Sequence, residues 1–154
     1  MNTIRPYHAD DFRIIAGLLG ESDPWKRLGY GLEDWTRLFA APLQGRDAFV
    51  IEVDGRAGGI AVLRPKFLFG EYLELLAVAP PARGRGYGRT LLAHVEGLVF
   101  TRANNLFVCV SDFNGRARTF YSNNGYAEIG RIPDLLIPGA AEILMRKTTG
   151  PARR

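Results

Sequence analysis

Apolar residues recur along the chain with two periods, one typical of helices and one typical of strands. The helical period predicts helices at residues 10–19, 32–40, about 86–99 and 116–123. Alternating or continuous apolar runs predict strands at residues 3–6, 49–53, 57–63, 68–78, 106–110, 126–132 and 142–147. The order β-α-α-β-β-β-α-β-α-β-β places the chain in the mixed α+β or α/β class.

Turn residues separate these elements where the apolar periods stop. Asp54-Gly55 is a dipeptide that favours a tight hairpin turn, and Pro65 and Gly70 predict a bend before the next strand. Pro42 ends the second helix. The strand at 106–110 is apolar throughout, which predicts a buried position beside parallel neighbours.

Length and composition suit one globular domain. A chain of 154 residues with 47% hydrophobic and 23% charged residues can bury one substantial core. Residues 1–147 are therefore expected to form a single domain, with 148–154 as a flexible tail. Apolar runs are far shorter than the roughly 18 residues of a membrane span, the first residues lack the apolar stretch of a signal peptide, and the single cysteine allows no internal disulfide. We expect a cytoplasmic protein without a membrane span.

The net charge of +4 is unevenly distributed. Up to Ala40 the chain has five basic and six acidic residues, whereas the remainder has fifteen basic and ten acidic ones. The positive excess accompanies the glycine-rich segment described next, without a run of lysine and arginine or a stacking-aromatic motif. A nucleic-acid-binding domain is an alternative, and it predicts steeply salt-dependent binding to duplex.

Residues 83–89 alternate glycine with arginine or tyrosine between an apolar strand and an amphipathic helix. The glycines are Gly84, Gly86 and Gly88, and the arginines are Arg83, Arg85 and Arg89. Glycines remove the Cβ atoms that would keep an anion away from backbone N–H groups. A helix that opens near Gly86 adds unpaired amides and the positive end of its dipole, and guanidinium groups bind phosphate oxygens. The segment therefore predicts a site for a phosphate-bearing ligand.

Two known phosphate loops match this segment poorly. A P-loop needs one more residue between its glycines than 84–88 provides, and Arg89 stands before Thr90 where that loop has lysine. A dinucleotide fingerprint needs G-x-G-x-x-G after the first strand of a βαβ unit. Here the glycines read G-x-G-x-G and several strands precede them, although Asp112 after the next strand is placed like a ribose ligand.

A third loop fits without a gap. The segment resembles the acyl-CoA loop of the GCN5-related N-acetyltransferases, [Q/R]-x-x-G-x-[G/A] between a strand and a helix, through Arg83, Gly86 and Gly88. Upstream, Leu76-Ala77-Val78-Ala79-Pro80 resembles the strand of that family that ends in Val-x-Pro. Downstream, the residues from Asn114 to Tyr126 resemble its second conserved stretch, so the matches cover about residues 71–130.

The resemblance implies a twisted, mostly antiparallel sheet that splays beside its fourth strand to admit the pantetheine arm of acetyl-CoA. It also implies direct transfer of an acetyl group to a primary amine in a ternary complex, giving an amide and free CoA. The residues expected to bind CoA are Leu76, Ala77, Val78, Arg83, Gly84, Arg85, Gly86, Tyr87, Gly88, Arg89, Asn114 and Tyr121. Of these, the Val78 N–H is expected to polarise the thioester carbonyl, and Asn114 is equally suited to cap a helix.

Glu74 is the candidate general base. The strand pattern places it in phase with Tyr72, Leu76 and Val78, and a half-buried carboxylate should have a raised pKa. Members of the family often use a glutamate on this strand, at a position that varies. A salt-bridged strand glutamate is the alternative interpretation, and Glu71 is a second choice for the base.

Tyr121 is the candidate general acid. In the family, the tyrosine on the helix after the fifth strand reaches the CoA sulfur, and a phenol with a pKa near about 10 stays protonated at neutral pH. The order Phe120-Tyr121 matches the family. The alternative is a core aromatic residue that packs beside Phe120.

Other residues with reactive side chains have less specific patterns. Cys109 lies within five apolar strand residues, and we interpret it as an inert core thiol rather than an acyl carrier. His8 and His94 are isolated and lack a second ligand at metal spacing, so no metal is predicted.

By the same resemblance, the acceptor amine should lie between the segment that joins the first two helices and a late loop. The segment contains Trp25, Tyr30 and Trp35, although such aromatics more often pack in a core. The loop spans residues 132–139, and its Asp134 is placed to meet a cationic amine. The acceptor itself is not specified, because one scaffold serves many amines. A homodimer, common in the family, and a non-catalytic CoA-binding regulatory module of the same fold are further alternatives.

Overall fold

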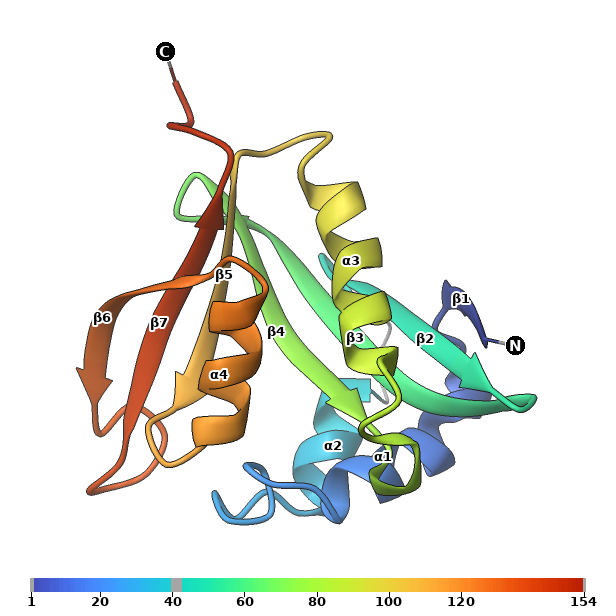
Figure 1. The fold of residues 1–154 in the computed structure, drawn as a ribbon. Helices are drawn as coiled ribbons and strands as arrows, with labels where there is room; N and C mark the ends of the chain where they lie inside the picture. Colours follow the sequence, from blue (N-terminus) through green and yellow to red (C-terminus); the bar gives the residue numbers. More distant parts are fainter. Residues whose placement is uncertain (1, 40–42, 154) are drawn as a thin grey trace.

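The computed structural model describes residues 2–39 and 43–153, in which a seven-stranded sheet carries helices on both faces (Figure 1). The strands are β1 (Asn2–Pro6), β2 (Asp47–Val53), β3 (Arg56–Phe67), β4 (Gly70–Val78), β5 (Asn105–Ser111), β6 (Ala127–Pro133) and β7 (Ala141–Thr148). They lie in the order β1-β2-β3-β4-β5-β7-β6, and β4 with β5 is the parallel pair while the other neighbours are antiparallel. The expected mixed, mostly antiparallel sheet is confirmed.

Four α-helices complete the fold in the predicted order. They are α1 (Phe12–Gly20), α2 (Leu32–Phe39), α3 (Tyr87–Val99) and α4 (Gly115–Asn123), and short 3₁₀ turns precede α1 at Ala9–Asp11 and follow β4 at Pro80–Ala82. The predicted end of the second helix at Ala40 and Pro42 lies outside the described residues. The apolar periods therefore located the helices and strands to within a few residues.

Two buried clusters show which helices cover which face of the sheet. The α3 cluster contains Ile51, Ala61, Leu63, Leu73, Leu91, Leu92, Val95, Val99, Leu106, Val108, Val110, Tyr121, Tyr126, Ile143 and Met145. The α1 cluster contains Ile15, Ala16, Leu18, Leu19, Trp35, Phe39, Val50, Ala57, Ile60, Val62, Leu75 and Ala77. Successive residues of β3 alternate between the clusters, as the strand period requires. α3 and α4 therefore pack on one face, and α1 and α2 on the other.

β4 and β5 separate after a short stretch of pairing. They pair at Glu71–Leu73 with Leu106–Val108, and Figure 1 shows them diverging beyond it, with α3 beside β4 and α4 beside β5. A β-bulge lies at the same point, because β3 pairs with Leu73 and Leu75 and leaves Glu74 without a partner. Bulges bend a strand and increase its twist, so the extra residue directs β4 away from β5.

The bulge corrects the predicted phase of β4. Leu73 and Leu76 pack with the α3 cluster, whereas Leu75 packs with the α1 cluster. Glu74 shares its face with Tyr72, as expected, but not with Leu76 and Val78. The expected phase was wrong because strict alternation cannot include an inserted residue.

The bend before β4 was also misplaced. Pro65 lies inside β3 opposite Glu71, and the turn consists of Leu68 and Phe69, whose φ angles of 44° and 59° are left-handed. Pro65 is accommodated because β2 pairs with β3 only as far as Leu63, so the missing N–H faces no partner strand. Gly70 has a different role, since a Cβ there would clash with the carbonyl oxygen of Asn105.

Other details agree with the sequence pattern or refine it. The Asp54-Gly55 turn is confirmed by φ angles of 52° and 77°. β5 has one parallel neighbour and one antiparallel neighbour, rather than parallel neighbours on both sides. At the C-terminal end, Thr149 N–H donates to the Asn104 carbonyl at 2.8 Å. The flexible tail stays a prediction.

Asp11 fixes the start of α1 to the sheet. Its carboxylate accepts two hydrogen bonds from the Arg5 guanidinium at 2.8 and 2.9 Å and one from the His8 N–H at 2.9 Å. The side chain is buried, and the bonds from Arg5 hold the pKa of Asp11 below its ordinary value. Asp11 is therefore a structural carboxylate with a cationic partner.

Candidate active site

The loop between β4 and α3 forms an open cradle for an anion. Gly84 and Gly86 have left-handed φ angles of 75° and 83°, and no protein atom lies within 4 Å of the position of a Cβ at either residue. α3 begins directly afterwards at Tyr87, with Gly86 as its N-cap. Because the first amides of a helix have no partner within it, these N–H groups are available to phosphate oxygens.

Arg83 connects this loop to the end of α1. Its Nε donates to the Val78 carbonyl at 3.1 Å, and its Nη2 donates to the Ser22 hydroxyl at 2.9 Å. Ser22 is fully buried and its hydroxyl donates to the Leu18 carbonyl. Arg83 therefore positions the loop through protein contacts, which the sequence pattern did not predict, whereas the Arg85 guanidinium lies over the ring of Tyr87 at 5.1 Å.

The edge of β4 that faces β5 is unpaired beyond the bulge. The Ala79 N–H donates to the Gly58 carbonyl at 2.8 Å, so by antiparallel alternation Ala77 also bonds toward β3. The N–H and C=O groups of Leu76 and the N–H of Val78 then point to the opening, while the Val78 carbonyl on the same edge already accepts from Arg83 Nε at 3.1 Å. This backbone edge is suited to pair with an extended ligand.

α4 closes the other side of the opening. A Cβ on Gly88 would lie 3.6 Å from Val78 and 3.8 Å from Phe120, so β4, α3 and α4 meet there. Asn114 Oδ1 accepts from the Ala117 N–H at 3.2 Å, which confirms its role as a helix cap. Its contact with pantetheine stays a prediction.

Tyr121 lies in the α3 cluster next to this meeting point. Its ring packs edge-on against Phe120 and Tyr126, with centroids 5.2 and 5.3 Å away. Burial raises the pKa of the Tyr121 phenol above its ordinary value. The hydroxyl therefore stays protonated at neutral pH and can act only as a donor or a neutral acceptor.

The opposite face of the opening carries polar side chains from three strands. Ile143, Val108 and Val110 belong to the α3 cluster, so their sequence neighbours on β5 and β7 face the other way. The residues on this face are Tyr72 of β4, Cys109 and Ser111 of β5, and Glu142 of β7. Cys109 is half-buried and belongs to neither core cluster. Burial raises the pKa of the Tyr72 phenol and of the Cys109 thiol, and the inertness of the thiol stays a prediction.

Glu142 was not identified from the sequence. It is 6% exposed, and its Oε2 accepts a hydrogen bond from the Ser111 hydroxyl at 2.7 Å. Burial and the charge of Asp112 raise the pKa of Glu142, while the bond from Ser111 lowers it. The available signal was one acidic residue at the start of the apolar run 141–145.

Glu74 and Glu71 are both ion-paired. Glu74 contacts Arg46 at 2.7 Å and Arg64 at 3.3 Å, so two guanidinium groups compensate its charge. Glu71 is buried and bound to Arg102 at 2.6 Å, which ties β4 to the end of α3. The structure therefore contains the salt-bridged arrangement that was the alternative for Glu74, and the base assignment stays a prediction.

The segment between α1 and α2 packs its aromatic rings together. Tyr30 stacks on Trp35 with centroids 5.3 Å apart, and Trp25 meets Trp35 edge-on at 6.0 Å. Burial, and after it the charge of Asp34, raises the pKa of the Tyr30 phenol. The aromatic rings of this segment therefore pack with one another, as the alternative interpretation expected.

The remaining predicted residues have structural contacts. Asp134 Oδ1 accepts from the Gly139 N–H at 2.8 Å and closes the β6–β7 loop, and the ring of His94 packs edge-on against Phe49 at 4.9 Å. Within residues 2–39 and 43–153, the side chains of His, Cys, Asp and Glu form no group of three suited to a metal. In the same residues, no helix combines the length and apolar character needed to cross a membrane.

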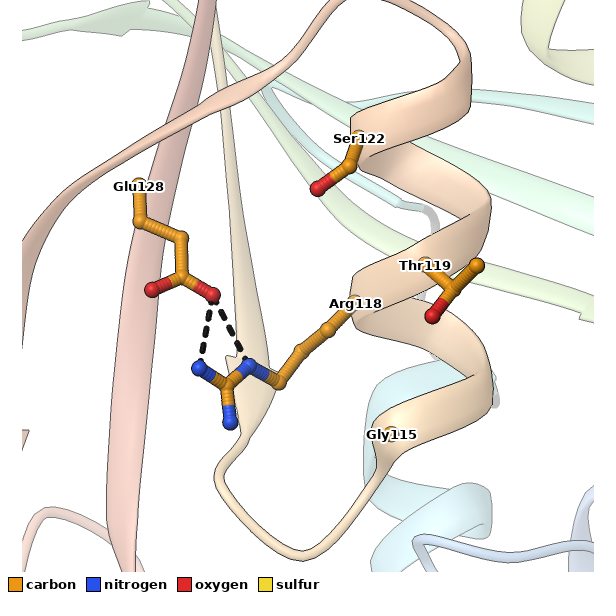
Figure 2. Close-up of a pocket in the computed structure, with 5 residues that line it drawn as sticks. All are labelled: Gly115, Arg118, Thr119, Ser122 and Glu128. Atoms are coloured by element: carbon orange, nitrogen blue, oxygen red, sulfur yellow. Dashed lines mark hydrogen bonds and ion pairs between the residues drawn. The ribbon is translucent and has the colours of Figure 1, made fainter.

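A shallow hollow on the outer side of α4 is separate from this site. Figure 2 shows that Arg118 reaches from α4 to Glu128 of β6, and two of its nitrogens lie 2.8 Å from one carboxylate oxygen. Gly115, Thr119 and Ser122 complete its lining. None of the predicted site residues lines the hollow.

Comparisons with known proteins agree with this geometry. The sequence profile of the Acetyltransferase (GNAT) family matches residues 4–126. An uncharacterised N-acetyltransferase of Methanocaldococcus jannaschii is 34% identical over 101 residues, and the match spans 64% of each chain, less than two thirds of the relative's length.

Solved structures resemble the fold over nearly the whole chain. The ribosomal-protein-S18-alanine N-acetyltransferase of Escherichia coli superposes with a TM-score of 0.80 at 19% identity, covering 98% of this chain and 96% of that one. The PaiA N-acetyltransferase of Thermoplasma acidophilum, in complex with coenzyme A, gives 0.76 at 18% identity, with 96% and 99% covered.

Proposed function

Because the chain belongs to the GNAT acetyltransferase family, we propose that it transfers an acetyl group from acetyl-CoA to a primary amine by direct attack in a ternary complex. The observation that carries the proposal is the open loop at Gly84 and Gly86, where α3 begins beside the free edge of β4. The anionic pyrophosphate of CoA suits the amides of this helix start. Coenzyme A bound to the structurally similar PaiA protein supports the same ligand here.

The pantetheine arm is proposed to pair with β4 through Leu76 and Val78. Both groups of Leu76 and the N–H of Val78 face the opening, so an extended ligand can pair with them in place of the strand that is missing there. The Val78 N–H then donates to the thioester carbonyl, and this bond strengthens as negative charge develops on the oxygen. Arg85 and Arg89 add positive charge near the phosphates, while Arg83 holds the loop to Ser22.

Tyr121 is proposed to protonate the leaving thiolate. The reaction forms a C–N bond and breaks the C–S bond, and the sulfur must receive a proton to leave as a thiol. A buried phenol with a raised pKa is fully protonated at neutral pH and can donate to that sulfur. The amine must lose a proton on the opposite face, where Glu74 is the carboxylate expected from the sequence.

Thiol release over a library of primary amines tests the proposal, with calorimetric CoA titration in parallel. The proposal predicts CoA binding and amine-dependent thiol release, whereas a regulatory module would bind CoA and release no thiol with any amine. Binding to duplex without CoA affinity would favour the nucleic-acid alternative. With one cysteine and no need for a disulfide, we place the enzyme in the cytoplasm.

A further inference from the structure

Glu142 lies on β7, one strand beyond the β5 edge of the opening, on the face away from α3 and α4. Its neighbour Ile143 packs in the α3 cluster, so Glu142 points to the other face. Its partner across the strands is Ser111. Ser111 follows Cys109 by two residues, where β5 has already left β4. An acceptor that reaches the thioester from the face opposite the CoA loop would meet this carboxylate.

Glu142 differs from the other buried carboxylates in lacking a cation. Buried Asp11 is paired with Arg5, and buried Glu71 is paired with Arg102. Within the described residues, the one polar side chain bound to Glu142 is the neutral Ser111. A buried carboxylate without a counter-charge is unfavourable, and such a group suits a ligand that supplies a positive charge.

The groups around Glu142 leave that charge uncompensated. Tyr72 and Cys109 lie on the same face of the sheet as Glu142, and burial raises the pKa of both, so they are neutral groups at pH 7. Asp112 adds a second negative charge, and the nearby Arg131 is engaged with Asp112 at 3.0 Å. Arg46 and Arg64 are engaged with Glu74. The local field therefore favours a cation.

We propose that Glu142, positioned by Ser111, binds the ammonium group of the acceptor and takes its proton. The inference rests on the proposed function and names its substrate class, a protonated aliphatic primary amine. The ammonium group transfers one proton to the carboxylate, leaving a neutral amine and a carboxylic acid. The neutral amine then attacks the thioester carbonyl, and the C–S bond breaks as the C–N bond forms. The thiolate takes a proton from Tyr121, and the second proton of the amine nitrogen restores the phenol. Glu142 returns its own proton to solvent after the product leaves. Glu74 is assigned a supporting role, because its two arginines already balance its charge.

Three glutamate-to-glutamine variants test this assignment in the thiol-release assay across pH. Glu142→Gln should lower kcat/KM for an aliphatic amine by about 10²- to 10⁴-fold, the range for general-base catalysis, and remove the acidic limb of the pH profile. CoA affinity should be unchanged. Glu74→Gln should lose less, and Glu128→Gln, whose side chain lies in the hollow outside α4, should match the parent.

Ser111→Ala separates a positioning role from a packing role. The bond from Ser111 lowers the pKa of Glu142, so its loss should move the acidic limb to higher pH while activity at alkaline pH is retained. A purely structural serine would reduce activity equally at every pH. An arylamine acceptor, which is neutral at pH 7, should be insensitive to Glu142→Gln.

Two outcomes would overturn this inference and leave the proposed function standing. One is turnover at the parental rate by Glu142→Gln. The other is an intact acidic limb of the pH profile in Glu142→Gln, with the large loss of kcat/KM in Glu74→Gln instead. A parent that binds CoA but releases no thiol with any amine would overturn the proposed function, and this inference with it. The melting temperature of Glu142→Gln should equal or exceed that of the parent at neutral pH, since no cation loses its partner.

Discussion

The two faces of the β4–β5 opening present different chemical groups, backbone on one face and side chains on the other. On the α3 side, the proposed donor site consists mainly of backbone groups from one continuous stretch, the β4 edge and the loop that starts α3. On the other side, the proposed acceptor site consists of side chains from separate strands, which are Tyr72, Ser111 and Glu142. The donor side can therefore be conserved in function while the acceptor side changes one side chain at a time.

The two faces also differ in charge. The loop offers amides and arginine side chains to an anion, whereas the opposite face offers a buried carboxylate and a neutral phenol. An anionic donor and a cationic acceptor would thus approach from opposite sides of the sheet. This arrangement brings the nucleophile and the thioester together without mixing their binding groups.

Gly86→Asp should prevent CoA from binding at the donor side, the largest effect expected of any variant. The substitution places a negative charge and a side chain where the phosphates are proposed to lie, and we expect CoA binding to be abolished in calorimetric titration. No protein atom lies within 4 Å of the added Cβ, so the cost to the fold is the strain of the left-handed φ of 83°, which aspartate bears better than most residues. A melting curve of the variant checks that it is folded.

Gly86→Asn is the matched control for that charge. Asparagine and aspartate tolerate the left-handed φ of 83° similarly, so the two variants differ mainly by one unit of charge. Gly86→Asn should weaken CoA binding by about tenfold, equivalent to about 1.4 kcal/mol. Equal and unchanged affinities in both folded variants would remove the loop from the donor site.

Tyr121→Phe tests the proposed general acid, which lies on the α3 side. If its hydroxyl donates to the leaving sulfur, kcat and kcat/KM should fall together by about 10²-fold, with KM for acetyl-CoA little changed. A donor with a more acidic leaving thiol should recover part of the rate. Parental turnover with both donors would assign the proton to another source.

Tyr126→Phe provides a control from the same aromatic group. The Tyr126 hydroxyl donates to Glu96 at 2.8 Å, away from the opening. We expect this variant to lower the melting temperature and to keep the parental kcat, the reverse of Tyr121→Phe. The pair of variants therefore distinguishes a hydroxyl that takes part in the reaction from one that only stabilises the fold.

Asp11→Asn should have the smallest effect and sharpen the contrast between carboxylates. Because Arg5 lowers the pKa of Asp11, the ionised form stabilises the fold above the ordinary aspartate pKa, and this contribution is lost as pH falls through the lowered pKa. The variant should lose about 1 to 3 kcal/mol of unfolding free energy at pH 7 and converge with the parent in acid.

Glu142 should show the opposite dependence in the same denaturation series. Its pKa is raised, so the folded state holds the proton more tightly and stability falls as pH rises from the ordinary glutamate value through the raised one. Glu142→Gln should abolish this decline. A Glu142→Gln variant that loses stability at pH 7 as Asp11→Asn does would identify a structural carboxylate.

The backbone geometry of the loop at Gly84 and Gly86 could be predicted from sequence because its requirements are local, while its role as the donor site stays a proposal. Left-handed turns at Gly84 and Gly86 need glycine, and the start of a helix follows from the apolar stripe of α3. The same reasoning located the order of helices and strands. Backbone conformation that depends only on neighbouring residues can therefore be predicted directly from the sequence pattern.

The acceptor side could not be predicted because its geometry depends on pairing between distant strands. Ser111 and Glu142 are 31 residues apart and meet only through the register of β5 with β7. The partners of Glu74 come from other segments in the same way, Arg46 from before β2 and Arg64 from β3. Alternation within a single strand also gave no sign of the bulge, which has no glycine to mark it.

The bulge at Glu74 has a consequence for chain length. With Glu74 removed, Leu73 and Leu75 would become neighbours and would still face the α3 and α1 clusters respectively, because strict alternation would then be restored. We therefore expect both cores to tolerate a β4 that is one residue shorter. The inserted residue is needed for the opening beside β5. A chain with Glu74 deleted should fold with a straighter β4 and bind CoA weakly, as melting and calorimetric titration would measure.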